Sequence, residues 1–558
     1  MSREKREKKN NLVTRVLIVF VLFVLLVPAL YLVARKYLPN FTVSDSPRKT
    51  DFMLVNQTLI SDYAPVQVGG KVYLPARFFS DSYNRSDAED YPVILEEPDY
   101  GLVTVTTNRT IEKLTADRGN VFEKDGSMYI SEETAEEYYP VSIKYVPEYN
   151  IAIVDSTETP ITECTVTKKT PLRDSDTIKG DIYEYLPKDT KVTLYSYDGG
   201  AFSFVRADEG LTGYVLTKDI ITTQVVQPSY IPQEPIHLGI DKKVVLLWEQ
   251  VTNLTASSQA AKTAPPAPVN VLSPTWFSFA PSLDGSILSI ADLDYVNNAH
   301  ANGVLVWGLL TDNFKDEVSQ TIFTNPDLRG AAIQNVAELS ERYNLDGINI
   351  DFENIGVDVA DHYLEFLREL APVLHERGKT LSVDVYVPTY TKYYNRNAIG
   401  RTADYVCVMT YDEHYGAASG SGAVASLPFV DDGIAETLKE IPKERVVMGL
   451  PFYVRVWRET EDEVSVFGNY TMDGGRKFFE DKGAVFGWVE DIGSYYAEYS
   501  TVEDGVSVTY KTWLEDPTSI EEKLRIYDKY DLAGVACWKR GLENDSVWDS
   551  IKRVGGNE

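Results

Sequence analysis

Eight apolar, strand-like runs alternate with helix-like stretches in the C-terminal half of the sequence, and this alternation limits the fold more than any other feature. Buried parallel strands that are joined by crossover helices are typical of a closed α/β barrel. We therefore predict a (β/α)8 TIM barrel at 235–556, with an insertion near 458–512 forming a small subdomain beside the cleft. The runs are 244–248, 271–277, 304–309, 347–352, 381–386, 405–409, 446–450 and 534–538.

One strand of this series carries a polar stripe. The stretch 346–353 reads Asp-Gly-Ile-Asn-Ile-Asp-Phe-Glu, and a period of two turns Asn349, Asp351 and Glu353 to the face that points into the barrel. Burying two carboxylates and an amide is costly unless they are paired or used. Barrel active sites lie at the carboxyl ends of the strands, so we interpret the stripe as an active site. The alternative is a buried hydrogen-bond network without a catalytic role.

The same stretch resembles the D-x-x-D-x-D-x-E signature of family 18 glycoside hydrolases, the chitinase-like enzymes. The resemblance covers about 238–548 and includes Met-Thr-Tyr-Asp at 409–412, Gly-Leu-Pro-Phe-Tyr at 449–453 and Trp538. It is strongest to the bacterial spore and cell-wall branch of the family. Asn349 stands where many chitinases have the middle Asp. An amide can donate a hydrogen bond to Asp351, but it cannot share a proton as a second carboxyl would.

The resemblance implies catalysis in which the substrate assists its own cleavage, without a cofactor. Glu353, as a neutral acid, would protonate the glycosidic oxygen while the acetamido carbonyl of the sugar attacks its own anomeric carbon. Asp351 would orient the acetamide and offset positive charge on the intermediate, and Tyr411 would hydrogen-bond the acetamido oxygen. Glu353 would then act as a base toward water, with retention of configuration.

Further side chains are expected to bind the sugar. Trp538 would form an apolar floor, and Asp412 would join the hydrogen-bonded shell, although a helix N-cap is an equally ordinary role for it. Other candidates are Asn349 and Asp346 from the signature and, with core or surface alternatives of equal weight, Tyr453, Trp276, Glu413 and His414. Five histidines and three cysteines, without HExxH or CxxC spacing, predict no bound metal and no disulfide framework.

The N-terminus predicts a membrane segment. A basic stretch at 1–15 precedes 16–34, which contains no charged residue and is long enough to span a bilayer. We predict an uncleaved signal anchor that leaves 1–15 in the cytoplasm and the catalytic domain outside the cell, because the stronger positive cluster lies on the N-terminal side. A cleaved signal peptide is the alternative.

Two modules are expected between the anchor and the barrel. Residues 50–158 contain a weak repeat, Gly-Lys-Val-Tyr-Leu at 70–74 and Gly-Ser-Met-Tyr-Ile at 126–130, and resemble the stalk-like α+β domain at the N-terminus of copper amine oxidases. Residues 160–226 predict a small β-barrel and resemble a bacterial SH3 domain. Phe202 or Phe204 occupies the usual Trp position, so wall binding and a plain spacer both stay open. A Pro-containing linker at 227–235 follows.

The formal net charge of −30 argues against a nucleic-acid partner. We expect a monomer whose substrate is peptidoglycan or a related aminoglycan, cleaved at β-linked N-acetylglucosamine. Two other functions stay open. One is a chitinase or chitooligosaccharide hydrolase, and the other is a catalytically silent sugar-binding protein.

Overall fold

The computed structural model describes residues 3–45, 51–56, 58–83, 91–107, 109–197, 199–230, 236–353 and 355–555, apart from the side chains of 3–13 and of residue 59. The last five residues of the expected linker lie outside these ranges. The chain divides into two compact units, one built mainly from residues before 233 and one mainly from residues after it.

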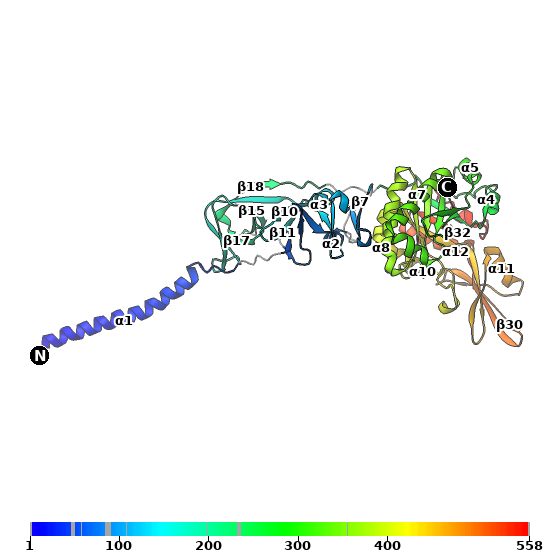
Figure 1. The fold of residues 1–558 in the computed structure, drawn as a ribbon. Coiled ribbons are helices and arrows are strands. Elements are labelled where there is room, and N and C mark those ends of the chain that lie inside the picture. The colour runs from blue at the N-terminus through cyan, green and yellow to red at the C-terminus, as the bar shows by residue number, and fades with distance from the viewer. Residues whose placement is uncertain are drawn as a thin grey trace. The chain divides into compact units, whose positions relative to one another are not determined.

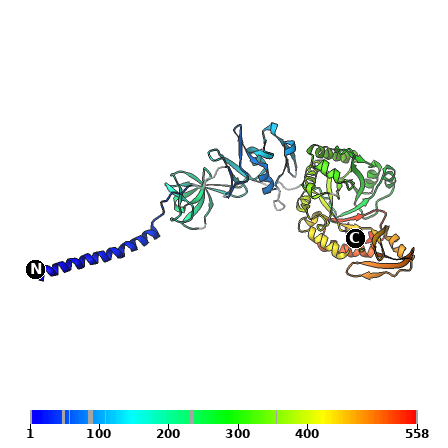
Figure 2. The same ribbon diagram turned by 60° about the horizontal axis from the view of Figure 1, so that its bottom comes forward.

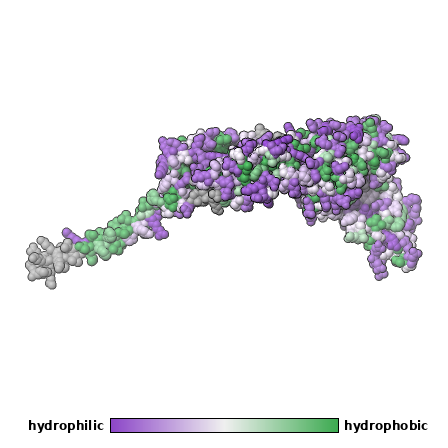
Figure 3. Space-filling model, viewed as in Figure 1, coloured by the Kyte–Doolittle hydropathy of each residue, from purple (hydrophilic) through white to green (hydrophobic). Residues whose placement is uncertain are grey.

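The first unit begins with one long apolar helix. Helix α1 (Arg3–Tyr37) has Arg35 and Lys36 in its last turn, and its part from Thr14 to Tyr37 is long and apolar enough to cross a membrane. In Figure 3 this part is the green, hydrophobic stretch near the N-terminus. Its length and composition fit either a signal sequence or a membrane anchor.

The weak sequence repeat corresponds to a repeated order of elements. Each copy runs strand, strand, helix, strand, strand, and the two copies pair where Leu74 lies opposite Ile130. The first copy is β3 (Val66–Val68), β4 (Lys71–Pro75), α2 (Ala76–Tyr83), β5 (Val93–Glu97) and β6 (Leu102–Thr106). The second is β8 (Val121–Lys124), β9 (Ser127–Ser131), α3 (Glu132–Tyr138), β10 (Val141–Val146) and β11 (Ile151–Ser156). Strands β1 (Phe52–Val55), β2 (Thr58–Ile60) and β7 (Ile111–Thr115) complete this region.

The segment 161–226 forms a sheet of its own, in the order β14-β13-β17-β16-β15-β12-β18. A small core of aliphatic residues, with Val166, Leu172 and Val205 fully buried, fills it. The likeness of this segment to an SH3 domain stays a prediction. Its strands are β12 (Ile161–Val166), β13 (Thr170–Arg173), β14 (Ile182–Leu186), β15 (Lys191–Ser196), β16 (Phe202–Ala207), β17 (Thr212–Leu216) and β18 (Ile220–Val226).

The second unit is a closed barrel of eight parallel strands, as predicted. The order β19-β32-β26-β25-β24-β23-β22-β20 closes through pairing of β19 with β20, and the short strand β21 (Ile287–Ser289) extends β20. The strands are β19 (Val244–Glu249), β20 (Val271–Phe279), β22 (Leu305–Thr311), β23 (Gly347–Asp351), β24 (Thr380–Tyr386), β25 (Tyr405–Met409), β26 (Val446–Pro451) and β32 (Gly534–Trp538).

Helices surround the barrel as an outer ring (Figure 2). Several begin at strong local signals, such as Asn325 capping α7 and Asp516 capping α12, each followed by Pro. The helices are α4 (Leu254–Ala260), α5 (Leu293–Ala301), α6 (Asp316–Val318), α7 (Pro326–Arg342), α8 (Ala360–Glu376), α9 (Arg396–Thr402), α10 (Leu427–Thr437), α12 (Pro517–Tyr530) and α13 (Val547–Ile551).

The insertion before the last barrel strand forms a five-stranded antiparallel sheet with one helix, drawn in orange in Figure 1. It begins at Tyr453, five residues before the predicted boundary at 458, because its first strand follows β26 directly and continues the same apolar run. Its elements are β27 (Tyr453–Glu459), β28 (Val464–Thr471), α11 (Met472–Glu480), β29 (Gly487–Val489), β30 (Ser494–Glu503) and β31 (Val506–Trp513).

Asp404 ties three segments together at the amino end of the barrel strands. Its buried carboxylate accepts hydrogen bonds from the backbone amides of Leu238 (2.6 Å) and Leu381 (2.7 Å) and lies 3.0 Å from Nε2 of His375. Burial alone would raise the pKa of Asp404, but the contacts with His237 and His375 and the Leu381 amide lower it to about 2. The native barrel therefore holds this carboxylate in its ionised form.

Replacing Asp404 by Ala should lower the free energy of unfolding of the barrel by about 3 kcal/mol, because two buried amides lose their acceptor. Thermal unfolding at pH 7 measures the loss. A depressed pKa stabilises the fold above the ordinary carboxyl pKa of 3.8, and this contribution disappears as the pH falls toward 2. The difference in stability between the native protein and the variant should therefore narrow at acid pH, and a constant difference down to pH 2 would contradict this assignment.

Candidate active site

Strand β23 presents its polar residues to the barrel interior at increasing height. Asn349 is fully buried, and Asp351 and Glu353 are half-buried at the carboxyl end of the strand. The alternate residues Ile348 and Ile350 are fully buried on the outer face, against the helices. The predicted alternation is therefore present, and it brings Asp351 and Glu353 to the end of the barrel where catalytic side chains of this fold lie.

Asn349 does not hydrogen-bond Asp351, contrary to expectation, because its amide is saturated by other residues. Its oxygen accepts hydrogen bonds from Nε1 of Trp248 and Oγ of Ser273, both at 2.9 Å. Its nitrogen donates to Oγ of Ser382 (3.2 Å) and to Oδ1 of Asp384 (2.7 Å). An amide has no further hydrogen-bonding capacity. Asn349 therefore lies beneath the site as a cross-link between strands.

Glu353 accepts a hydrogen bond from the hydroxyl of Tyr386, the last residue of β24. Burial is the main cause that raises the pKa of Glu353 above its usual range. The carboxylates of Asp312 and Asp412 add to this rise, and the hydrogen bond from Tyr386 opposes it. A carboxyl in this environment keeps its proton to a higher pH than an exposed glutamate does, which suits a proton donor.

Asp351 lies among other carboxyls. Burial and then the charges of Asp384, Glu353 and Asp312 hold its pKa well above its usual range. Asp312 follows β22 directly and is itself fully buried, and its Oδ1 accepts a hydrogen bond from the amide of Phe314 at 2.9 Å. The end of the barrel thus concentrates acidic groups that come from three neighbouring strands.

Tyr411 lies two residues beyond the end of β25 and is almost fully buried beside these carboxyls. Burial and then the charge of Asp384 raise the pKa of its hydroxyl well above the usual value, and Asp351 and Glu353 contribute as well. Its ring packs edge-on against Tyr453, with ring centroids 6.4 Å apart. Gly449 makes room for this ring, because a Cβ there would lie 2.9 Å from Cε1 of Tyr411.

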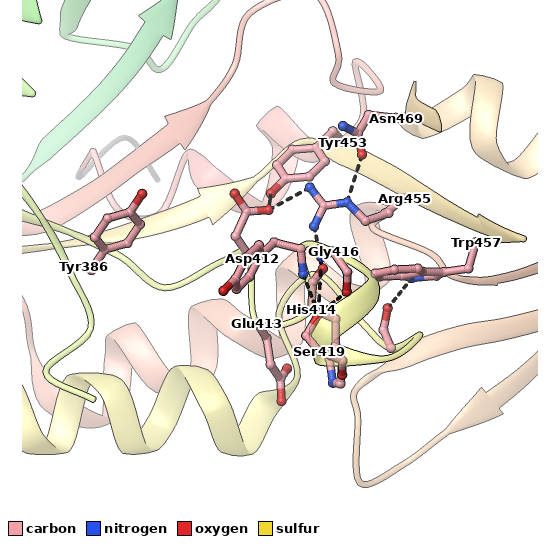
Figure 4. A network of polar contacts seen from close by, with 12 residues as sticks. Tyr386, Asp412, Glu413, His414, Gly416, Ser419, Tyr453, Arg455, Trp457 and Asn469 are labelled. Carbon is pink, nitrogen blue, oxygen red and sulfur yellow. Dashed lines mark hydrogen bonds and ion pairs between the residues drawn. The ribbon is translucent and has the colours of Figure 1, made fainter. Parts of the chain in front are cut away.

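Asp412 is the centre of a second polar network, shown in Figure 4. Its carboxylate accepts hydrogen bonds from the hydroxyl of Tyr453 and from Nη2 of Arg455 at 2.8 Å. The backbone of Asp412 is left-handed, with φ of 60°, a conformation that Asp tolerates better than most residues. The helix that follows, α10, is capped by Ser426, so Asp412 is not its N-cap. Its side chain stays partly exposed beside Tyr453.

Glu413 and His414 turn away from the carboxyl cluster and order the loop after β25. The carboxylate of Glu413 accepts a hydrogen bond from the amide of Ser426 at 2.8 Å. Nδ1 of His414 lies 2.9 Å from the carbonyl of Ser419, and the backbone carbonyl of His414 accepts a hydrogen bond from Arg455. Figure 4 shows the Glu413 side chain pointing away from Asp412.

Trp538 ends β32 and is half-buried at the same end of the barrel. Its ring lies edge-on to Trp248, with centroids 5.9 Å apart and planes at 64°. Trp248 in turn donates its hydrogen bond to Asn349 beneath the carboxyls. This arrangement places a partly exposed indole next to the polar stripe, where an apolar floor was expected.

Two more of the expected site residues, Asp346 and Trp276, lie away from the carboxyl cluster. Asp346 precedes β23 at its amino end, where its carboxylate lies 2.8 Å from both the amide of Val306 and Nε2 of His300. Trp276 lies at an irregularity in the pairing of β20 with β22 and is only 2% exposed. Its Nε1 donates to Ser257, so it belongs to the packing between the barrel and its helices.

Four residues of the site were not predicted from the sequence, namely Asp384, Tyr386, Arg455 and Asp312. Asp384 and Tyr386 share the inward face of β24 with Ser382. The available signal in the sequence was Asp384, a single charged residue inside an apolar run. Arg455 lies on the first strand of the insertion and carried no such signal. Among the described residues, no group of three or more His, Cys, Asp or Glu is arranged to hold a metal ion.

Comparison with known proteins agrees with this geometry. Residues 311–543 match the family model described as glycosyl hydrolases family 18. The uncharacterized glycosylase YvbX of Bacillus subtilis is 24% identical over 289 residues, which cover 50% of this chain and 82% of that protein. The cortical fragment-lytic enzyme of Bacillus subtilis is 24% identical over 290 residues, 49% of this chain and 65% of that enzyme.

A solved structure shows the same fold. It is a C-terminal domain from Desulfitobacterium hafniense DCB-2, which is 23% identical and superimposes with a TM-score of 0.50 over 56% of this chain and 98% of that domain. The matched family model covers β23 with its acidic stripe and most of the other barrel strands. The C-terminal half of this chain therefore carries a chitinase-like glycoside hydrolase domain of family 18.

Proposed function

We propose that this protein is a retaining hydrolase that cleaves β-linked N-acetylglucosamine in peptidoglycan or a related aminoglycan, with assistance from the acetamido group of the substrate. The observation that carries the proposal is the pair Asp351 and Glu353, of which Asp351 ends β23 and Glu353 lies two residues beyond it, at the carboxyl end of the barrel. The raised pKa of Glu353 supports its role as the proton donor.

The division of roles follows from the positions of the side chains. Glu353 stands highest on the stripe and would protonate the glycosidic oxygen. Asp351, one step deeper, would orient the acetamide and offset the positive charge of the cyclic intermediate, while Tyr411 would donate a hydrogen bond to the acetamido oxygen. Asp412, Tyr453 and Trp538 would contact the sugar around these groups. Water would then attack with Glu353 as the base.

Peptidoglycan is the first choice of polymer, supported by the similarity to the cortical fragment-lytic enzyme. The second candidate is a chitooligosaccharide, which is favoured by a similarity to human di-N-acetylchitobiase, 25% identical over 81% of that protein. Digestion of purified peptidoglycan and of chitin, followed by mass analysis of the soluble products, separates them. Muropeptides with a reducing N-acetylglucosamine end support the proposal, and release of sugar from chitin alone would overturn the choice of polymer.

We further propose that helix α1 stays attached as a single-pass membrane anchor, so that the barrel works outside the cell. The uncharged run 16–34 and the basic cluster before it support this orientation. The modules at 50–158 and 160–226 would then act as a spacer that holds the hydrolase near the wall. Fractionation of the full-length protein tests the anchor, because a cleaved protein would appear in the soluble fraction.

Replacing Tyr386 by Phe should shift the pH profile of hydrolysis. The hydrogen bond from Tyr386 lowers the pKa of Glu353, so its loss raises that pKa further and moves the alkaline limb of kcat/KM upward by about one pH unit. We expect kcat to fall by about tenfold. The matched control is Tyr390→Phe, because Tyr390 is exposed and donates to a backbone carbonyl. An alkaline limb that stays in place or moves down would contradict the role of Tyr386.

A further inference from the structure

Asp384 is a buried carboxyl that the proposed roles leave unused. It lies on β24 with its side chain turned into the barrel and is only 3% exposed. Its Oδ1 accepts the 2.7 Å hydrogen bond from Asn349. Burying a carboxyl in a barrel interior is costly, and the neighbouring layers could have been filled by aliphatic side chains. A buried carboxyl on the strand next to Asp351 therefore needs an explanation.

The strand register places Asp384 beside Asp351. Strands β23 and β24 are parallel, with Asn349 opposite Ser382 and Ile350 opposite Val383. One residue further along, Asp351 and Asp384 stand at the same level on adjacent strands, whose axes are roughly 5 Å apart. Among the neighbouring charges, Asp384 contributes most to raising the pKa of Asp351, after the effect of burial.

Titratable groups face Asp384 from the sides of both neighbouring strands and from helix α8. They are Asp351 and Glu353 on the β23 side, Cys407 on β25, Tyr411 beyond β25, and the more distant Tyr363 on α8. Burial is the main cause that raises the pKa of Asp384, to about 8, and the hydrogen bond from Asn349 opposes the rise. Two adjacent buried carboxyls in such surroundings titrate as a pair, and once the pair has lost one proton the other can be shared between them.

We propose that Asp384 is a positioning residue that shares one proton with Asp351, and that it supplies from the neighbouring strand the second carboxyl that Asn349 cannot provide. The inference rests on the proposed function. When positive charge develops on the sugar, the proton moves from the Asp351 carboxyl to the Asp384 carboxylate, which leaves Asp351 ionised and Asp384 neutral. The proton returns when water opens the intermediate. No other atom or electron is transferred, so the step is balanced.

The test exchanges the two side chains across their hydrogen bond. The variants are Asp384→Asn and the double variant Asn349→Asp with Asp384→Asn, both made in the full-length protein. The exchange keeps a hydrogen bond between positions 349 and 384 and restores the number of carboxyls. Ser382→Ala is the matched control, because it removes a hydrogen bond to the same Asn349 amide but no carboxyl. The measurement is the pH profile of kcat and kcat/KM on one soluble aminoglycan, with thermal unfolding to establish that each variant is folded.

In Asp384→Asn we expect kcat to fall at least tenfold with KM within threefold, and the acidic limb of kcat/KM to move upward by about one pH unit. The direction follows because a shared proton stabilises the singly ionised pair, whereas Asp351 alone must ionise in a buried site. The exchanged double variant should return the acidic limb to its native position and recover most of kcat. Ser382→Ala should leave the acidic limb in place.

Two results would overturn the inference. One is a native acidic limb in folded Asp384→Asn, and the other is an exchanged variant that behaves like Asp384→Asn. Hydrolysis by the native protein and by Glu353→Gln is measured in parallel. If native hydrolysis depends on Glu353 while either result is obtained, only the shared proton is rejected. If native hydrolysis does not depend on Glu353, the proposed function is rejected together with the inference.

Discussion

Glu353→Gln is expected to lose about a thousandfold in kcat, because the amide retains the size of the side chain but cannot donate the proton that the leaving oxygen needs. The variant should still bind the glycan, since the groups proposed to contact the acetamide remain. Its unfolding temperature should be close to that of the native protein or above it, because a half-buried carboxyl with a raised pKa is replaced by a neutral group. Release of reducing ends from a soluble aminoglycan measures kcat.

The matched control for this variant is Glu249→Gln. Glu249 ends β19 and accepts hydrogen bonds from Tyr295 (2.6 Å) and Arg540 (2.8 Å), which a glutamine oxygen can also accept. The Glu249→Gln variant tests whether the loss of any acidic side chain at this end of the barrel impairs hydrolysis. We expect less than a threefold change in kcat for the control. Native turnover in Glu353→Gln would remove Glu353 from its proposed role.

Asp351→Asn is expected to lower kcat by about a hundredfold, with a smaller effect on KM. An asparagine can still orient the acetamide through its oxygen, but it carries no charge to offset the positive intermediate. The loss therefore falls on the step in which charge develops. Steady-state kinetics on the same aminoglycan separates the effects on kcat and KM.

Asp346→Asn provides the contrast, because Asp346 belongs to the same sequence signature but lies at the amino end of β23. We expect it to lower the unfolding temperature through its contacts with His300 and Val306 and to keep kcat within threefold. If Asp346→Asn lost as much kcat as Asp351→Asn in folded protein, the signature would act as one unit and the placement of its first residue outside the site would be wrong.

The barrel could be predicted because its strands are buried on both faces, so each one reads as an apolar run with a recognisable length. All eight runs agree with the observed strands within two residues at each end, as with 405–409 and β25. Strand β20 extends two residues beyond its predicted run, to Phe279, and contains an irregularity at Trp276. Trp276 was a candidate because it lies at the end of a predicted strand. At the irregularity the regular alternation of side chains is lost, and Trp276 packs outward instead.

The alternation of inward and outward side chains along β23 could have separated Asp346 from the other residues of the signature. Asn349, Asp351 and Glu353 have odd numbers and face inward, whereas Asp346 has the parity of Ile348, which faces outward. The sequence signature suggested Asp346, and the geometry of a strand argues against it. Asp384 and Tyr386 could have been found by applying the same parity to β24. The network of Asp412 with Arg455 could not have been found in this way, because it depends on how the insertion folds back beside the barrel.

Comparing one glycan before and after chemical removal of its N-acetyl groups tests the central claim most directly, because the acetamide of the substrate is proposed as the nucleophile. Reducing-end release should fall by about a thousandfold at linkages whose reacting sugar has lost its acetyl group, since an ammonium group cannot attack the anomeric carbon. The native protein should cleave the re-acetylated glycan at its original rate. Equal rates on the acetylated and de-N-acetylated glycans would contradict substrate-assisted catalysis at Asp351 and Glu353.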